Sequence, residues 1–195
     1  MTHINRTRRI VALASFTVAS LGLAACGDSS TEPGGEQEVI SRVTLTLTPS
    51  GGGTALTAFI EDPDGNGAQA PSAQVGTLAL TPGASYTGTV KFENRLVNPP
   101  QDITTEVQAE ANSHRVFYTV TGTGVTVTTT DNDSQGRPLG VNFTKAVGAT
   151  GATNGTTRVV LCHYEDAKVG TQTSCQGDTD IDVTFNFTIA TPAAN

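Results

Sequence analysis

Alternation of apolar and polar residues runs through most of the chain after residue 38, and this feature limits the fold more than any other. From Ile181 to Ile189 every second residue is apolar, with Asp, Thr or Asn residues between them. A period of two places the apolar side chains on one face of a strand, as in antiparallel sheets with one solvated face. The pattern predicts nine strands, near residues 40–48, 54–61, 74–81, 85–93, 115–121, 124–130, 139–146, 157–164 and 180–190.

Nine short strands joined by turn sequences predict an all-β fold, an immunoglobulin-like antiparallel β-sandwich. Glycine-containing links at 51–53, 82–84 and 122–124 fit hairpin turns. One short helix is predicted over 102–114, where the first residue, Asp, can accept a hydrogen bond from the first helical turn. We take residues 39–192 as one sandwich domain.

The connections that hold most of the loop acids are predicted to lie at one end of the sandwich. If successive strands run antiparallel, consecutive connections alternate between the two ends. Connections dominated by Gly, Pro and Thr then share one end. The acidic connections share the other end, at residues 62–73, 94–114, 131–138 and 165–179.

The first acidic connection contains EDPDGNG, residues 61–67, which matches the first ligand positions of an EF-hand calcium loop. An EF-hand is excluded, because Ala73 stands where that loop needs a bidentate Glu and no flanking helices are predicted. Calcium can still be held if acids from several loops complete an oxygen shell. The candidate ligands are Asp62, Asp64, Asn66, Asp131, Asp133, Asp178 and Asp180. The alternative, which we expect, is that these residues serve tight turns.

Histidine usage gives little sign of catalysis. After the N-terminal segment the chain has only His114 and His163, too few for the multi-histidine site of a copper–zinc dismutase-like sandwich. We expect His163 to be a core or edge residue of an apolar strand, and His114 to be a surface or capping residue at the end of the helix. A His114–His163 metal pair at the acidic end is the alternative. No nucleophile motif, phosphate loop or clear acid–base carboxylate pair is visible, so we expect no enzyme.

The first 25 residues have the features of a secretory signal peptide, with three arginines before the apolar residues 10–25. The apolar segment ends in LAAC, residues 23–26, which resembles the lipobox of bacterial lipoproteins. The resemblance implies that Cys26 is lipidated and becomes the mature N-terminus. An ordinary secretory signal with a chance cysteine is the alternative.

The segment after the signal peptide is expected to hold the domain at a membrane. Residues 26–38 contain the lipidated cysteine and a polar, flexible tether. Gly27 after the cysteine favours the outer membrane by analogy with the enterobacterial sorting pattern. We therefore expect a membrane-anchored protein of the bacterial cell envelope, periplasmic or surface-exposed.

Cys162 and Cys175 remain as an even pair once Cys26 is assigned to lipid. An oxidising envelope compartment allows a disulfide between them, and we predict this bond. Two free thiols or a pair of metal ligands are the alternatives.

The mature chain is expected to be strongly acidic. Loss of three of the 11 basic residues leaves 8 against 18 acidic ones, a net charge of −10. Such a surface repels nucleic acid and anionic lipid headgroups. The absence of Trp also argues against the aromatic platforms of sugar- and base-binding modules.

Several phrases of the sequence resemble a group of small uncharacterised lipoproteins from Bacteroidetes and related bacteria. They are the lipobox and tether, TLTPSGGGT, DPDGNG, LTPGASYTGTVKFEN, HRVFYT and TDIDVTFNFTI, and together they extend over nearly all of the mature chain. Some members carry the label type 1 periplasmic binding fold, which implies a two-lobed α/β protein. The length and strand-rich pattern of this chain favour a sandwich instead. The resemblance implies a lipoprotein and identifies no catalytic residue.

These features predict a lipid-anchored, non-catalytic envelope protein that acts as a binding or interaction module for a protein or a small ligand. The alternative function is a calcium-binding or ligand-recognising sandwich that uses the acidic loop end. A metalloenzyme built on the histidines is the third interpretation.

The anchor can be tested at Cys26. Because the cysteine sulfur carries the lipid, Cys26→Ser should release the protein from membranes or block its maturation. Detergent-phase partitioning of the parent and the variant measures this. Equal partitioning of the two proteins would contradict the lipoprotein interpretation.

Overall fold

The computed structural model describes residues 38–65, 68–166 and 168–189. Cys26, the signal peptide and Asn66 lie outside the described residues. The described chain forms β1 (Arg42–Pro49), β2 (Leu56–Glu61), β3 (Leu78–Leu80), β4 (Ser85–Asn94), β5 (Gln101–Asp102), α1 (Ile103–Ala109), β6 (His114–Val120), β7 (Val125–Thr129), β8 (Asn142–Val147), β9 (Gly155–His163) and β10 (Asp178–Ile189). All nine predicted strands are present, although β3 is much shorter than expected, and the short β5 was not predicted.

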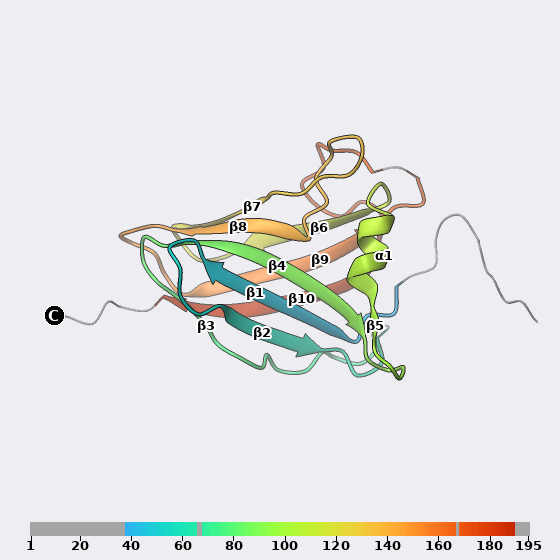
Figure 1. Ribbon diagram of the computed structural model, residues 1–195, viewed down its shortest axis with the longest axis horizontal. Coiled ribbons are helices and arrows are strands. Elements are labelled where there is room, and N and C mark those ends of the chain that lie inside the picture. The colour runs from blue at the N-terminus through green and yellow to red at the C-terminus, as the bar shows by residue number, and fades with distance from the viewer. Residues whose placement is uncertain (1–37, 66–67, 167, 190–195) are drawn as a thin grey trace, which may run out of the picture. The chain divides into compact units, whose positions relative to one another are not determined.

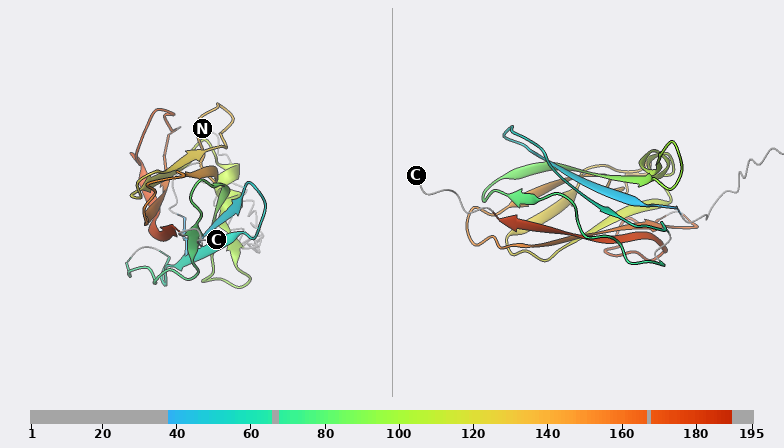
Figure 2. Two further views of the ribbon diagram at one scale, coloured as in Figure 1. Left: turned by 90° about the vertical axis from the view of Figure 1, so that its left-hand side faces the viewer. Right: turned by 90° about the horizontal axis from the view of Figure 1, so that it is seen from below.

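The strands form two sheets that pack face to face, which confirms the predicted β-sandwich (Figure 1). One sheet has the order β2-β1-β4-β8-β7, with β5 paired to β4, and the other has the order β3-β10-β9-β6. Figure 2 shows β1 and β10 in opposite layers. The pairing of β3 with β10 is parallel, an exception to the antiparallel arrangement that we predicted.

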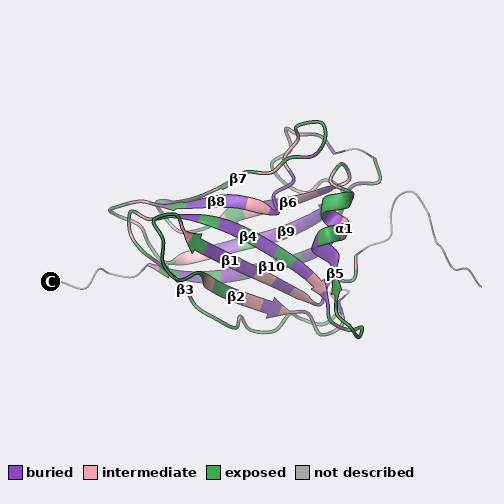
Figure 3. Ribbon diagram, in the orientation of Figure 1, coloured by how far each residue is buried: buried purple, intermediate pink, exposed green. Residues whose placement is uncertain are grey.

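The core lies between the sheets and follows the alternation of the sequence (Figure 3). On β1, Val43, Leu45 and Leu47 are buried, while the threonines between them are only partly covered. Gly88 interrupts the apolar pattern of β4 because a Cβ there would lie 2.1 Å from the ring of Phe143. Gly88 therefore lets the ring of Phe143, on β8, lie against the backbone of β4.

The helix differs from its prediction at the C-terminal end. Asp102 caps α1 as expected, since its side chain accepts a hydrogen bond from the backbone N–H of Thr104. The helix ends at Ala109, however, and not at His114. His114 is the first residue of β6 and is fully buried, so its expected role as a surface or capping residue is wrong. No helix in the described part of the chain is long and apolar enough to cross a membrane.

The acidic connections gather at one end of the sandwich, as predicted. Arg42 at the start of β1 pairs with Glu61 and Glu93, so β2 and β4 both finish there. In the second sheet β6 begins beside the last residue of β9. We call this end, formed by residues 62–65, 68–71, 95–113, 130–141, 164–166 and 168–177, the loop end (Figure 1).

A disulfide joins Cys162 to Cys175, with 5.4 Å between their Cα atoms, which confirms the predicted bond. Cys162 lies on the outer face of β9 and packs in a small apolar cluster with Phe117, Val160 and Tyr164. The disulfide therefore holds the connection between β9 and β10 against the sheet.

One lysine lies inside the sandwich. The side chain of Lys145, on β8, is fully buried; its Nζ donates to Thr157 Oγ1 and lies 4.2 Å from the centre of the Phe187 ring. Burial lowers the pKa of Lys145 to about 8. Below that pH the folded protein holds a charged ammonium without a carboxylate partner among the described residues, which costs stability.

Replacement of this buried pair by apolar residues should stabilise the domain. We expect Lys145→Met with Thr157→Val to raise the free energy of unfolding by roughly 1–4 kcal/mol at pH 7. The folded pKa is below the unfolded one, so the stability of the parent should rise between pH 8 and 10.5 and the gain should shrink there. Urea denaturation of the parent and the variant at pH 7 and near pH 10.5 measures the difference in their free energies of unfolding. A variant no more stable than the parent at pH 7 would show that burial of the ammonium does not lower the free energy of unfolding.

Candidate metal centre

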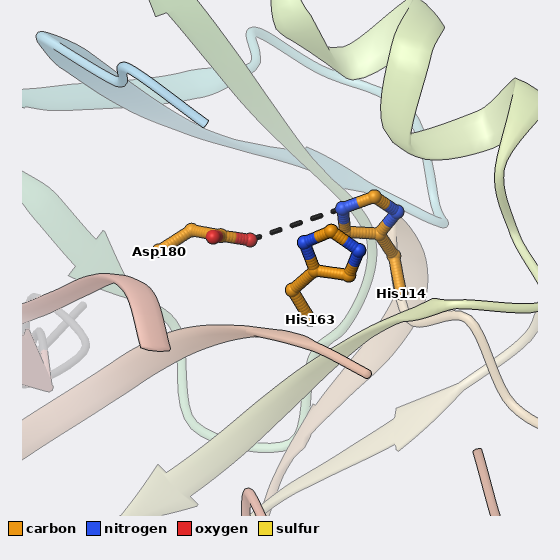
Figure 4. A group of neighbouring side chains, drawn as sticks. All are labelled: His114, His163 and Asp180. Atoms are coloured by element: carbon orange, nitrogen blue, oxygen red, sulfur yellow. Dashed lines mark ion pairs between the residues drawn. The ribbon is translucent and has the colours of Figure 1, made fainter. Parts of the chain in front are cut away.

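Two histidines face each other inside the loop end. His114 begins β6 and His163 ends β9, and the two residues are direct partners in the antiparallel register. Both side chains are buried, and their rings stack with centroids 4.5 Å apart (Figure 4). The strand pairing thus brings together two imidazoles that are 49 residues apart in the sequence.

A β-bulge adds a carboxylate to the histidine pair. The alternation of β10 would point Asp180 to the same outer face as Asp182, but the register shifts between Thr179 and Ile181. As a result Asp180 and Ile181 are both buried. Bulges re-aim side chains in this way. Asp180 Oδ2 lies 3.8 Å from His114 Nε2 (Figure 4).

The contacts of His114 leave a lone pair on the nitrogen that faces Asp180. Its Nδ1 is 3.3 Å from the backbone oxygen of Glu110. A carbonyl oxygen can only accept, so Nδ1 carries the proton and Nε2 of the neutral ring does not. Burial, with the nearby His163 and Lys168, lowers the pKa of His114 to about 4, so the ring is neutral at pH 7.

Asp180 presents a second acceptor to the same point. Its Oδ1 accepts a long hydrogen bond from the backbone N–H of Glu38, 3.4 Å, while Oδ2 has no hydrogen-bond partner among the described residues. His114 Nε2 has none there either. Burial raises the pKa of Asp180 to about 6. At pH 7 the carboxylate is therefore mostly ionised, and two buried acceptors face each other with no proton between them.

A second group of possible ligand atoms shares His114 with the first. Ligand atoms of Glu38, Glu110 and His114 lie within 4.8 Å of one another. Burial, together with the negative charges of Glu106, Asp180 and Glu110, raises the pKa of Glu38 to about 7. The excess of negative charge at this point would be relieved by a cation.

The donor set indicates which cation fits. Ligand atoms of His114, His163 and Asp180 also lie within 4.8 Å of one another, and all three residues are buried. Two imidazoles and one carboxylate suit Zn²⁺ and neighbouring divalent transition metals, whereas Ca²⁺ prefers six to eight oxygen ligands. A metal-binding imidazole usually donates its other ring N–H to a carbonyl or carboxylate oxygen, as His114 Nδ1 does to the backbone oxygen of Glu110.

The residues proposed for calcium lie in separate local networks. In the first loop, Asp62 Oδ1 accepts from the backbone N–H groups of Asp64 and Gly65, and Asp64 Oδ2 accepts from that of Gln69. These contacts are those of a turn. Asp131 begins the acidic connection at residues 131–138. Its side chain accepts from the backbone N–H groups of Gly140 and Asn142.

Asp133 holds two loops together. Its side chain accepts from Arg137 Nε, 2.7 Å, and lies 3.5 Å from the buried Lys168 Nζ. Burial opposes its ionisation, but the hydrogen bonds from Arg137 and Gln135 outweigh burial and lower the pKa to about 2. Asp178 is exposed near the loop end. Within the described residues the close ligand groups include Asp180 but none of the other calcium candidates.

The sequence anticipated only part of this centre. The His114–His163 pair is the alternative that we do not favour, and Asp180 is a candidate ligand of a calcium shell that we do not expect. The sequence signal for the centre was the placement of both histidines next to connections of the acidic end. Glu38, which we assigned to the tether, instead contacts the sandwich through Asp180.

Comparison with known proteins does not add to this assignment. No protein-family model, curated protein or solved structure shows a significant match to the chain.

The turn function of the first loop can be tested with Asp62→Asn and Asp64→Asn together. An Asn oxygen accepts the same backbone N–H bonds as the Asp oxygen it replaces, so the double variant should melt like the parent, with or without calcium. Thermal unfolding in calcium and in chelator measures this. A melting temperature that rises with calcium in the parent alone would instead support a calcium site.

Proposed function

We propose that this protein is a lipid-anchored, non-catalytic envelope protein whose sandwich domain binds a divalent transition-metal ion at His114, His163 and Asp180. Zn²⁺ is the best chemical match to these donors. The observation that carries the proposal is the 3.8 Å approach of two buried acceptor atoms, His114 Nε2 and Asp180 Oδ2, neither of which has a hydrogen-bond partner in the described chain.

Energetics favour a cation over an unfilled polar gap. An unsatisfied buried polar atom costs about 1–3 kcal/mol, and two acceptors that face each other also repel. A water molecule could donate to both atoms, but it would leave the negative charge of Asp180 uncompensated. A divalent ion accepts electron density from both atoms and offsets the carboxylates of Glu38 and Glu110 as well.

Metal binding also agrees with the charge and the location that the sequence predicts. A net charge of −7 for the full chain attracts cations to the domain. The tether would keep the centre close to the membrane, because Glu38, the first described residue, already contacts Asp180.

The proposal predicts that the purified, metal-stripped protein binds one Zn²⁺ per chain. Removal of a residue that hydrogen-bonds to a metal ligand typically weakens a metal site 10- to 100-fold, so loss of a ligand itself in Asp180→Asn or His163→Gln should weaken binding by at least about 100-fold. Isothermal titration calorimetry measures both. Asp182→Asn, an exposed position on the same strand, is the matched control and should bind like the parent.

Asp180→Asn offers a further check without metal. An Asn amide can donate to His114 Nε2, so this variant should be more stable than the metal-free parent by about 1 kcal/mol, yet gain no stability from Zn²⁺. The parent should gain about 2.7 kcal/mol when Zn²⁺ is a hundredfold above its dissociation constant. Failure of the parent to bind Zn²⁺, or equal binding by Asp180→Asn, would contradict the proposed function.

A further inference from the structure

A depression of about 400 Å³ adjoins the candidate metal centre. It is lined by residues between His163 and Asp178, in the connection that the disulfide closes. His163 is the one residue shared by the depression and the His114–His163–Asp180 group. The side chains of His114 and Asp180 are fully buried and do not line the depression. The depression therefore adjoins the centre through His163.

We propose that the metal bound by His114, His163 and Asp180 keeps a coordination position that opens to this depression, and that the position takes a nitrogen-donor ligand carrying a positive charge. This inference rests on the proposed function. It adds the class of ligand that the loop end recognises.

The number of donors supports an open position. Zn²⁺ sites with four protein ligands are closed, whereas sites with three protein ligands hold water or another ligand in the fourth position. The group contains two imidazoles and one carboxylate. Asp180 Oδ1 is engaged with the backbone N–H of Glu38, which favours binding through Oδ2 alone. Glu38 and Glu110 form a separate group with His114, so these three donors leave one position of a tetrahedral ion for an outside ligand.

The charge around the depression selects the ligand. Glu165, Asp166 and Asp178 all line it and are exposed. The lining also contains Lys168, but its ammonium is fully buried and donates to the backbone oxygens of Ala111 and His114. The same ammonium lies beside the carboxylate of Asp133. The lysine charge is thus already compensated, and the depression presents three carboxylates to an incoming molecule.

Both the donor atom and its neighbourhood favour nitrogen. A carboxylate ligand would be repelled by these acids, whereas an imidazole or amine nitrogen is neutral when it coordinates. The Oε1 atom of Gln172 in the lining is buried and has no hydrogen-bond partner among the described residues. It can accept an N–H from a ligand that also carries an ammonium group.

The test uses the full mature protein loaded with Co²⁺, whose visible spectrum reports changes in coordination. Three probes share one donor and differ in charge: 1-(3-aminopropyl)imidazole is positive, 1-methylimidazole is neutral and imidazole-1-acetic acid is negative. We expect all three to change the spectrum, with the positive probe binding roughly three- to tenfold more tightly than the neutral one and the negative probe binding most weakly.

The matched variant is Glu165→Gln with Asp166→Asn, which removes two exposed charges and leaves the three metal ligands intact. It should bind Co²⁺ and 1-methylimidazole like the parent and lose most of the preference for the positive probe.

The outcomes separate the two proposals. Absence of a Co²⁺ spectrum would overturn the proposed function and this inference with it. Co²⁺ binding with a spectrum that no imidazole changes would leave metal binding standing and overturn the open position. Equal affinity for the three probes, or a charge preference unchanged in the variant, would overturn the selection by the depression.

Discussion

The register between β6 and β9 is the constraint on which the loop end depends. His114 and His163 meet because the first residue of one strand is the direct partner of the last residue of the other. A shift of one residue would move the side chains of a strand to the opposite face. His114 would then leave the interior, and the apolar residues that follow it on β6 would leave the core with it. The same contacts that stabilise the sandwich therefore fix the geometry of the two imidazoles.

The fold could be predicted from the sequence because alternation reports which face of a strand is buried. Ile181, Val183, Phe185 and Phe187 are buried as their spacing indicates. The ends of the sandwich could also be predicted, since antiparallel strands place connections alternately. Cys162 and Cys175 pair as the count of cysteines suggested. Each of these inferences uses a repeat, an order or a count that can be read from the sequence itself.

The centre itself could be predicted only in part, because it depends on departures from those patterns. Asp180 is inside only because a bulge adds a residue to β10, and period-two reasoning places it outside. His114 belongs to a strand because its pairing with β9 prevails over the helix-forming residues before it. Glu38 reaches the centre through a contact 142 residues away in the sequence, which no local pattern encodes.

The unsatisfied acceptors persist because the surrounding loops are held in place. Lys168 donates to the backbone oxygens of Ala111 and His114, and it pairs with Asp133 in the neighbouring loop. One buried ammonium thereby joins three segments of the loop end. The disulfide fixes the same connection from the other side.

Without these ties His114 or Asp180 could turn toward water and avoid the cost of unpaired burial, about 1–3 kcal/mol per atom against a stability of roughly 5–15 kcal/mol for a whole domain. With them the donors stay where they are before any ion arrives, so little conformational entropy remains to be lost on binding. The stability of the loop network thus keeps the two unpaired acceptors in place as preorganised ligands.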